Sequence, residues 1–481
     1  TMRSGRSESP RKVVVIGAGV TGLTAARELA RGRGGRPAEV VVLEASPRVG
    51  GKVRTEQVDG APVETGPDSF VTLKPEMLDL VKELGLQDEL VCTGADPTVS
   101  VFKGGRLVPL PAGMNLVSPT KLLPFALSTL FSMRGKLRMA LEPLIPAGKS
   151  LEDESLADFA RRRLGAEALE VLVGPMLAGI YAGDPEKMSI KSTFPQLLEM
   201  EKRGGLVRSM WLGAPKRARR EGITTFMTIK NGLSRVMSAL ERSLPSGAVR
   251  TDCPVRAVRR RGGRWEVATP QGTFEADVVV AAVPASALAD CVEGLDAELA
   301  IRLREIPFVS TATTTLIYDA ATFPLLPKGF GFLIPREAGS TLAAATYSSS
   351  KFPSRSPSGK VVIRAFIGGA GREESAEGPL SRIEESVRCD LHKVLGIKGV
   401  SPIAAKTARW IKGNPQYNVG HARRLERLGS CLKSHPGLIL AGCSYRGVGL
   451  PDCVRSGRRA AELASPTRSG REHDTAHAGL A

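Results

Sequence analysis

The chain has 481 residues, a length that predicts two or three domains. Its composition is 42% hydrophobic and 24% charged, as in globular proteins with a large core, and no run approaches the ~20 apolar residues that span a bilayer. The formal net charge of +18 would suit nucleic acid, an anionic membrane surface or an acidic substrate, and it equally suits general solubility.

The seven cysteines are scattered without a Cys-x-x-Cys pair, and there are only five histidines. Scattered cysteines in odd number are typical of reduced thiols and argue against a structural zinc site. The first ten residues, TMRSGRSESP, contain no apolar segment of the kind found in secretory signals. We therefore expect a cytoplasmic protein with no metal site.

A strand, a helix and a second strand are predicted at the start of the chain. Residues 11–19, RKVVVIGAG, carry the continuous β-branched run of a buried parallel strand. Residues 20–32, VTGLTAARELARG, place apolar residues at helical spacing, and residues 39–46, EVVVLEAS, form a second buried strand. This order predicts the first βαβ unit of a nucleotide-binding sheet.

The turn between the first strand and the helix has the spacing Gly-x-Gly-x-x-Gly. Gly17 allows the tight turn, Gly19 lets the backbone approach a pyrophosphate, and Gly22 lets helix and strand pack closely. The helix N-terminus adds free N–H groups and positive potential. The expected cofactor contacts of the turn are Gly17, Ala18, Gly19, Val20, Thr21 and Gly22.

The end of the second strand and the segment after it indicate which dinucleotide binds. Glu44 can accept hydrogen bonds from ribose hydroxyls and would repel a 2′-phosphate, which argues against NADP. The segment ASPRVGGKVRT (45–55) suits a second pass of backbone along the pyrophosphate, which an NAD site does not need. We therefore predict FAD, with contacts from Ala45, Arg48, Gly50, Gly51 and Lys52.

These motifs resemble the FAD fingerprint of the family that includes monoamine oxidases, phytoene desaturases and protoporphyrinogen oxidases. VETGPDSF (63–70) is similar to the protoporphyrinogen oxidase branch, and so are LAGIYAGDPEKMSIKSTFPQL (177–197), NPQYNVGH (414–421) and the segment 437–462. The resemblance follows the family's order along nearly the whole chain. It implies cofactor contacts from Gly66, Pro67, Asp68 and Ser69 at the flavin, Val255 at the adenine, and Trp410.

The residues of the segment 437–462 also predict its structure independently of the resemblance. A strand ends at Gly442, and a helix then begins near Val448, Gly449 and Leu450. The N-terminus of that helix would stabilise the negative charge of a reduced flavin.

The resemblance implies that the substrate is a porphyrinogen, oxidised by three successive two-electron transfers to FAD with dioxygen as the final acceptor and hydrogen peroxide as product. Lys74 resembles a residue near the substrate carboxylates, although it can equally be a solvated loop lysine. Gly179 resembles a glycine whose carbonyl takes part in deprotonation, and Ala178 stands where some members have Arg. The sequence leaves open whether protoporphyrinogen or coproporphyrinogen is preferred. A related amine oxidase or carotenoid desaturase is the alternative activity.

The expected fold class is α/β, α+β overall, with three domains and a tail. A Rossmann-type FAD-binding domain takes residues 10–80, 235–290 and 433–464, a mixed-sheet substrate-binding domain takes 81–98, 192–234 and 291–432, a helical cap or membrane-binding domain takes 99–191, and a disordered tail takes 465–481.

Residues 116–145 are expected to be helical, with apolar clusters interrupted by cations such as Lys121, Arg134 and Lys136. Such a segment can lie peripherally on the cytoplasmic membrane, or it can simply cover the substrate cavity. Binding to nucleic acid is not expected, because the cations are spread along the chain and aromatic residues make up only 5% of it. A homodimer is left open.

Overall fold

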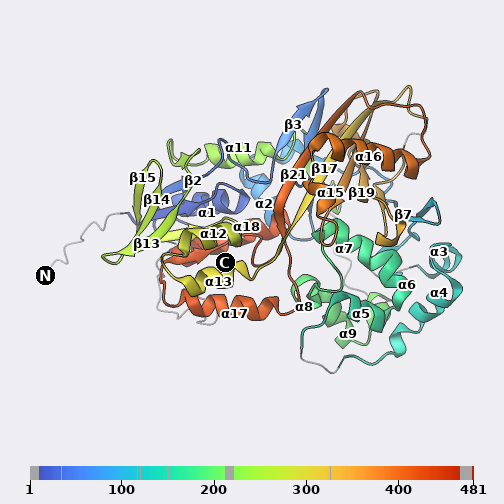
Figure 1. Cartoon of the computed structure of the whole chain (residues 1–481), viewed down its shortest axis with the longest axis horizontal. Coiled ribbons are helices and arrows are strands. Elements are labelled where there is room, and N and C mark those ends of the chain that lie inside the picture. The colour runs from blue at the N-terminus through green and yellow to red at the C-terminus, as the bar shows by residue number, and fades with distance from the viewer. Residues whose placement is uncertain are drawn as a thin grey trace.

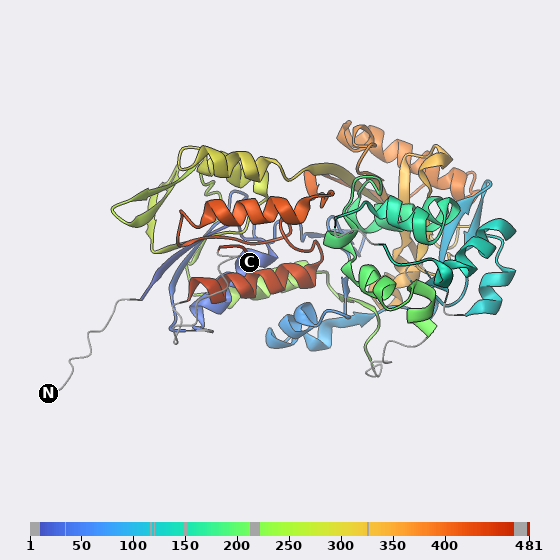
Figure 2. The same cartoon turned by 90° about the horizontal axis from the view of Figure 1, so that it is seen from below.

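The computed structural model describes residues 10–33, 35–115, 118–119, 121–148, 152–211, 222–324, 327–465 and 479–481. Two lobes lie side by side along the long axis of the molecule (Figure 1), and the view from below shows the same division (Figure 2). One lobe is built on a five-stranded sheet and the other on a seven-stranded sheet with a group of helices beside it. The mixed α/β class is as predicted.

Five parallel strands form the sheet of the first lobe, in the order β12-β2-β1-β16-β22. They come from the start, the middle and the end of the chain, so the predicted assembly of this sheet from discontinuous segments is confirmed. The strands are β1 (Lys12–Ile16), β2 (Glu39–Leu43), β12 (Val249–Arg250), β16 (Val278–Ala281) and β22 (Leu438–Leu440).

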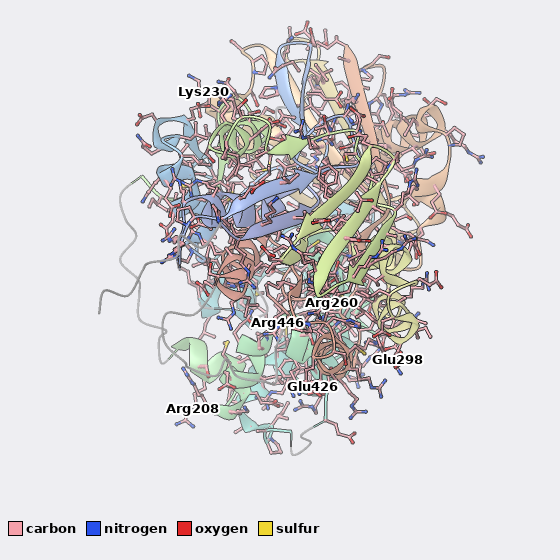
Figure 3. All side chains as sticks on the ribbon, turned by 90° about the vertical axis from the view of Figure 1, so that its left-hand side faces the viewer. Arg208, Lys230, Arg260, Glu298, Glu426 and Arg446 are labelled. Atoms are coloured by element: carbon pink, nitrogen blue, oxygen red, sulfur yellow. The ribbon has the colours of Figure 1, made fainter. Side chains whose placement is uncertain are left out.

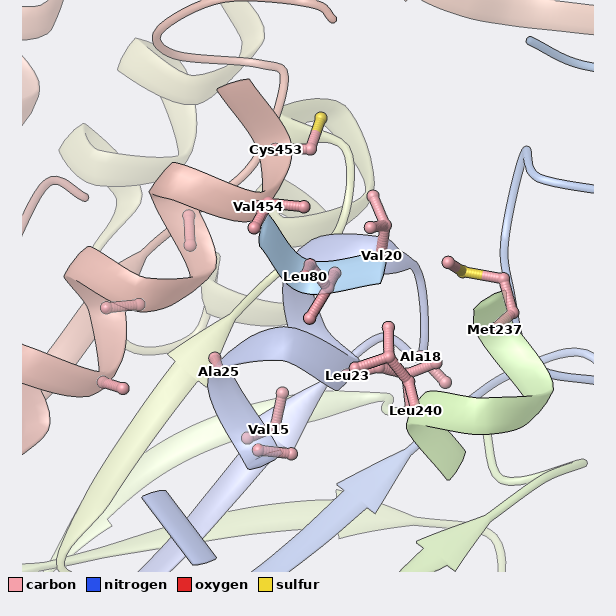
Figure 4. Packing of buried hydrophobic residues seen from close by; sticks show 14 of the residues in the cluster. Val15, Ala18, Val20, Leu23, Ala25, Leu80, Met237, Leu240, Cys453 and Val454 are labelled. Carbon is pink, nitrogen blue, oxygen red and sulfur yellow. The ribbon is translucent and has the colours of Figure 1, made fainter. Parts of the chain in front are cut away.

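Both faces of this sheet are covered, which is why its strands are continuous apolar runs. On one face Val13 and Val15 pack against the helices α1 (Val20–Ala30), α11 (Ser234–Arg242) and α18 (Leu450–Ala464), as Figure 4 shows around Val15 and Leu23. Val14 and Ile16 face a second core on the other side. The elements there are α12 (Ala285–Val292), α13 (Ala297–Arg304), α17 (His421–Leu432), and an antiparallel sheet of β13 (Ala257–Arg261), β14 (Arg264–Thr269) and β15 (Gly272–Ala276).

Seven strands form the sheet of the second lobe, in the order β21-β17-β20-β19-β18-β7-β8. All neighbours are antiparallel except β18 and β7. The helix α16 (Leu380–Leu395) packs against this sheet through Val387 and Leu391. The strands are β7 (Val99–Lys103), β8 (Arg106–Pro109), β17 (Phe308–Asp319), β18 (Gly331–Leu333), β19 (Leu342–Tyr347), β20 (Lys360–Gly368) and β21 (Ala404–Pro415).

The helical group differs from its expected range at both ends. Residues 99–109 are not helical, because they form the hairpin β7-β8 at the edge of the seven-stranded sheet. At the other end the helical core continues past residue 191 to include Leu197 and Leu206. The helices are α3 (Leu122–Leu127), α4 (Met133–Ala140), α5 (Leu156–Arg163), α6 (Ala166–Ala168), α7 (Gly174–Tyr181), α8 (Ile190–Thr193), α9 (Pro195–Lys202) and α10 (Leu206–Trp211).

The remaining elements are shorter. They are β3 (Thr55–Val58), β4 (Ala61–Glu64), β5 (Phe70–Val71), α2 (Glu76–Glu83), β6 (Leu90–Cys92), β11 (Phe226–Ile229), α14 (Ser348–Lys351) and α15 (Glu374–Glu377), with the two-stranded pair β9 (Met114–Asn115) and β10 (Ser118–Pro119) beside the helical group.

Part of the segment 465–481, which was expected to be a disordered tail, packs against the rest of the molecule. Leu480 and Ala481 are buried, and residues 479–481 run beside β22, where the N–H of Leu440 donates to the carbonyl of Gly479 at 2.7 Å. The apolar side chain of Leu480 fills a place in the core on that side of the sheet. The rest of the expected tail, 466–478, lies outside the described residues.

Within the described part of the chain, no helix combines the length and the apolar character that crossing a membrane requires. Charged side chains of both signs are mixed over the face drawn in Figure 3, where the labelled cations Arg208, Lys230 and Arg260 come from separate parts of the chain and lie apart.

Candidate cofactor and substrate site

The glycine turn after β1 has the geometry of a dinucleotide site. Gly17 has a φ of +98°, and a Cβ there would lie 2.8 Å from the carbonyl oxygen of Ala282. A Cβ on Gly22 would overlap the carbonyl oxygen of Gly17. At Gly19, by contrast, a Cβ would meet no atom within 4 Å. The chain thus needs glycine at 17 and 22 for its own packing, whereas at Gly19 it leaves open space at the N-terminus of α1.

Glu44 closes the turn from the neighbouring strand. One oxygen of its carboxylate accepts from the N–H of Ala18 at 2.8 Å, and the other accepts from the N–H and the hydroxyl of Ser46 at 2.9 and 2.7 Å. The N–H of Cys253 donates to the Glu44 carbonyl at 2.8 Å, which brings the segment that leads to Val255 beside it. The predicted ribose and adenine contacts, including the exposed Ala45, therefore lie together at the carboxyl end of β2.

The second glycine segment runs next to the first, as a shared pyrophosphate site requires. Gly50 pairs with Gly19 in an isolated parallel bridge, and its N–H donates to the Ala18 carbonyl at 2.8 Å. Gly51 lies so close that a Cβ on it would be 3.4 Å from the Cα of Gly19. Arg48 braces this segment by donating to the Gly51 carbonyl at 2.8 Å, and burial lowers the pKa of its guanidinium.

Lys52 points away from its own loop, toward the end of the chain. Its ammonium contacts the carbonyl of Gly413 and lies 3.9 Å from the sulfur of Cys443. The carbonyl of Lys52 occupies the space where a Cβ on Gly66 would be. The second glycine segment therefore touches both the GPDS loop, residues 66–69, and the strand end at 442–443.

The GPDS loop, which contains Gly66, Pro67, Asp68 and Ser69, is anchored to the second lobe. The carboxylate of Asp68 accepts from the Ser69 hydroxyl at 2.7 Å and pairs with Lys351 of α14 at 3.3 Å. Burial would raise the pKa of Asp68, but the charges of Lys351 and then Arg364 outweigh it and hold that pKa well below its usual value. Arg364 of β20 also donates to the Gly66 carbonyl.

Sequence reasoning did not find these partners. Arg364 is conspicuous as a cation within the apolar run KVVIRAFIG, and that was the available signal. Trp410 of β21 was expected near the cofactor, and its indole N–H donates to the carbonyl of Thr65 at 2.8 Å, just before the GPDS loop.

The N-terminus of α18 lies where it was expected, behind Gly442 and with Gly449 as its N-cap. Gly442 has a φ of +109°, and its N–H donates to the Ser456 hydroxyl at 2.8 Å. Val448 and Gly449 are partly exposed, and Leu450 begins the helix. Lys74 pairs with Asp452 in the first turn of this helix at 2.7 Å, a partner that the sequence did not reveal.

The segment around Gly179 approaches the cofactor loops through two tyrosines. Gly179 is exposed in the last turn of α7, and Tyr181 at the end of that helix packs edge-on against Tyr417 with ring centroids 6.3 Å apart. The hydroxyl of Tyr417 donates to the Cys443 carbonyl at 2.6 Å. Beside Gly179, Ala178 lines a small cavity together with Arg336 and Arg372.

His421 is buried, stacks on Tyr417 and donates from Nε2 to the Tyr445 carbonyl at 2.9 Å; burial lowers its pKa to about 4. No group of three or more His, Cys, Asp or Glu side chains among the described residues is placed to hold a metal ion.

Comparison with known proteins agrees with this arrangement. Residues 20–464 match the family described as flavin containing amine oxidoreductase. The chain is 36% identical over 468 residues to coproporphyrinogen III oxidase of Bacillus subtilis (strain 168), covering 94% of this chain and 98% of that protein. It is 32% identical over 486 residues to protoporphyrinogen oxidase of Homo sapiens, covering 94% and 98%.

Solved structures show the same relationship. One from Exiguobacterium sp. 255-15, named for protoporphyrinogen oxidase, has a TM-score of 0.84 at 33% identity and covers 95% of this chain and 99% of its own. Putrescine oxidase, at 18% identity and a TM-score of 0.66, shares the fold alone. The chain belongs to the flavin containing amine oxidoreductase family. It is an FAD-dependent oxidoreductase, and the predicted cofactor and family are confirmed.

Proposed function

We propose that the protein oxidises a porphyrinogen to the corresponding porphyrin in heme biosynthesis, with coproporphyrinogen III or protoporphyrinogen IX as substrate. The observation that carries this proposal is the end-to-end similarity to relatives named for these two reactions, at 36% and 32% identity over 94% of the chain. When bound, FAD supplies a two-electron acceptor, so the chain itself needs no nucleophile or metal. Dioxygen is the proposed final acceptor.

The open space at Gly19 supports the proposal that the pyrophosphate lies between the two glycine segments. Glu44 would then hold the ribose, and the GPDS loop and the N-terminus of α18 would flank the flavin. Asp452 would place a negative charge in that first turn, and Lys74 together with Arg455 balances it. We propose that Lys74 stabilises the first turn of α18 through this pair. Because its side chain is half-exposed, we propose that it also contacts a substrate carboxylate.

The test is anaerobic mixing of the FAD-loaded protein with each porphyrinogen in turn. We expect at least one of them to bleach the visible flavin band, and readmitted air to restore it with release of hydrogen peroxide. If neither bleaches a fully loaded flavin, the proposed substrate class is wrong.

Two arginines beside Ala178 support carboxylate recognition near Gly179. Arg336 donates to the carbonyl of Ala370 at 2.5 Å and lies 3.8 Å from Asp184, whereas Arg372 donates to the Arg336 carbonyl at 2.8 Å. We propose that they receive propionates at the rim of the cavity beside Ala178.

An Arg372→Gln variant should raise KM for coproporphyrinogen, which has more propionates than protoporphyrinogen, about tenfold, while kcat changes little. This change in KM corresponds to a loss of about 1.4 kcal/mol of binding free energy. The exposed Arg382→Gln on α16 is the control, and equal KM values in the two variants would contradict the role.

An exposed apolar surface supports peripheral contact with an anionic membrane. Its seven side chains are between 45% and 79% exposed and come from residues 122–144. They are Leu122, Leu123, Leu127, Met133, Leu137, Leu141 and Leu144. Cations such as Arg134 and Lys136 lie in the same segment, so the apolar side chains can enter a bilayer while the cations meet anionic headgroups.

Flotation with vesicles that contain anionic lipid tests this surface. The double change Leu127→Asp and Leu137→Asp should abolish flotation, because it puts charge where acyl chains would lie. The exposed Leu380→Asp on α16 should leave flotation unchanged. Equal flotation of the two variants would show that this surface serves another purpose.

A further inference from the structure

Two cysteines meet at the edge of the cofactor site. Cys443 follows β22 directly after Gly442, and Cys453 lies in the first turn of α18. Both are free thiols, and each shifts the pKa of the other through an interaction between the two side chains, which lowers the pKa of Cys443 and raises that of Cys453. The loop between them turns the chain back, so that the hydroxyl of Thr21 lies beside Gly442 and also contacts the carbonyl of Cys453.

Neighbouring elements hold both cysteines in place. The Tyr417 hydroxyl donates to the carbonyl of Cys443 at 2.6 Å. The Thr21 hydroxyl, from the nucleotide turn, donates to the carbonyl of Cys453 at 3.1 Å. Figure 4 shows Cys453 at the end of α18 that approaches Val20 of that turn. The backbones of the two cysteines are thus held by neighbouring elements, close to the predicted path of the cofactor.

The surroundings favour the thiolate form of Cys443. The hydrogen bond from the Cys453 thiol lowers the pKa of Cys443, burial opposes this, and the charge of Lys52, 3.9 Å away, lowers it further. The exposed Cys389 offers a contrast, because its hydrogen bond to Glu385 raises its pKa. Since the thiolate is the nucleophile, Cys443 should be more reactive than its partial burial suggests.

We propose that Cys443 and Cys453 form a redox-active dithiol, which hydrogen peroxide oxidises to a disulfide beside the cofactor site. The Cys443 thiolate attacks one peroxide oxygen, so an S–O bond forms, the O–O bond breaks and hydroxide leaves. Cys453, as its thiolate, then attacks the sulfur of this sulfenic acid, so the S–S bond forms and a second hydroxide leaves. The two thiol protons convert both hydroxides to water, and the two electrons have passed from the sulfurs to the peroxide.

Peroxide is also the product of the proposed reaction with dioxygen, so turnover would generate the oxidant next to the thiols. The dithiol chemistry itself needs only added peroxide. The test of the dithiol therefore contains no porphyrinogen. A negative result would contradict the dithiol proposal alone and would leave the proposed substrate unaffected.

The test is peptide mapping of the FAD-loaded protein. The reduced protein is exposed to hydrogen peroxide, its remaining thiols are alkylated, and it is digested with trypsin without reduction. Cleavage after Lys433, Arg446 and Arg455 leaves Cys443 and Cys453 on the separate peptides 434–446 and 447–455. We expect these peptides to appear joined, about 2 Da lighter than their sum, and to separate after treatment with dithiothreitol.

Three comparisons make the result decisive. Cys443→Ser and Cys453→Ser should each abolish the joined peptide, and Lys52→Gln should slow alkylation of Cys443 several-fold. Cys389 serves as an internal reference, which should react after Cys443 despite its greater exposure. Oxidation of Cys389 without any joined peptide, or modification of Cys443 alone, would overturn the proposal.

Discussion

Gly19 differs from the other two glycines of its turn, because nothing in the chain itself requires glycine there. Its φ is −72°, which any residue can adopt, and its missing Cβ faces open space. Gly17 and Gly22, in contrast, are needed for close packing of the backbone. A substitution at Gly19 can therefore separate cofactor binding from folding.

A Gly19→Val variant should fold normally yet bind FAD at least about tenfold more weakly, because its side chain would occupy the place proposed for the pyrophosphate. The measurement is flavin absorbance per protein together with the thermal unfolding of the cofactor-free form. Gly294→Val is the matched control, because a Cβ at Gly294 also meets no atom within 4 Å and that residue lies away from the turn. A yellow Gly19→Val protein would contradict the assignment of the turn.

His421 makes stability depend on pH. Burial lowers its pKa from 6.5 to about 4 in the folded protein, so the unfolded chain takes up a proton first as the pH falls. Neutral His421 therefore does not reduce the free energy of unfolding above pH 6.5. Between pH 6.5 and about pH 4 the free energy of unfolding falls progressively, by about 3 kcal/mol in total. Urea unfolding of the wild type and of His421→Gln should be measured across this pH range. As the pH falls, the free energy of unfolding should decrease more steeply for the wild type. Parallel curves would show that His421 is charged in the fold.

At the scale of elements, one buried ion pair holds the helical group together. Glu142, in the 3-10 turn Glu142–Leu144, pairs with Arg163 of α5, and both side chains are at most 1% exposed. The same carboxylate accepts from the N–H groups of Leu206 and Val207 at 2.8 and 3.1 Å, at the start of α10. Three separate parts of the group thus meet at one side chain.

Glu142→Ala should destabilise the protein by about 3 kcal/mol, because it leaves the buried charge of Arg163 only the more distant carboxylate of Glu201, 3.7 Å away. Glu186→Ala removes a partner of Arg161, two residues away on the same helix but exposed, and should cost less than about 1 kcal/mol. Chemical denaturation of both variants and of the wild type gives the change in the free energy of unfolding for each substitution. Similar small decreases for the two variants would mean that water or a neighbouring group replaces the carboxylate of Glu142.

Local motifs were predictable where the residues that interact are close in the sequence. The turn 17–22, Glu44 and the second glycine segment lie within 40 residues and came together as expected. The pair of Lys74 with Asp452 spans 378 residues, and no local pattern could indicate it. The contacts of Asp68 with Lys351 and Arg364 are hidden for the same reason.

Secondary structure was harder to predict at the borders between units. In residues 99–109, polar and apolar side chains alternate over too few positions to predict a hairpin. The place of β7 in the sheet depends on its pairing with β18, which is distant in the sequence. Leu480 looked like part of a polar terminus, yet its side chain is buried and its backbone pairs with Leu440 of β22.

At the scale of the whole molecule, the FAD-binding lobe depends on both ends of the chain. β22 pairs with β16, and α18 packs on α1 through Val454 and Leu23. A chain that ends at residue 432 lacks this strand and helix, so it should retain no flavin, whereas the full chain should purify yellow. The measurement is flavin content after gel filtration of each protein, and a yellow truncated protein would show that the lobe closes without them.

This arrangement has a consequence for biosynthesis. On the ribosome, the first glycine turn is made about 400 residues before the strand β22 and the helix α18 that complete its surroundings. The pocket therefore stays unfinished on the nascent polypeptide until β22 and α18 have been made. We therefore expect nascent polypeptides to capture the coenzyme only after α18 has been made, and a shortage of riboflavin to act on them from that point on.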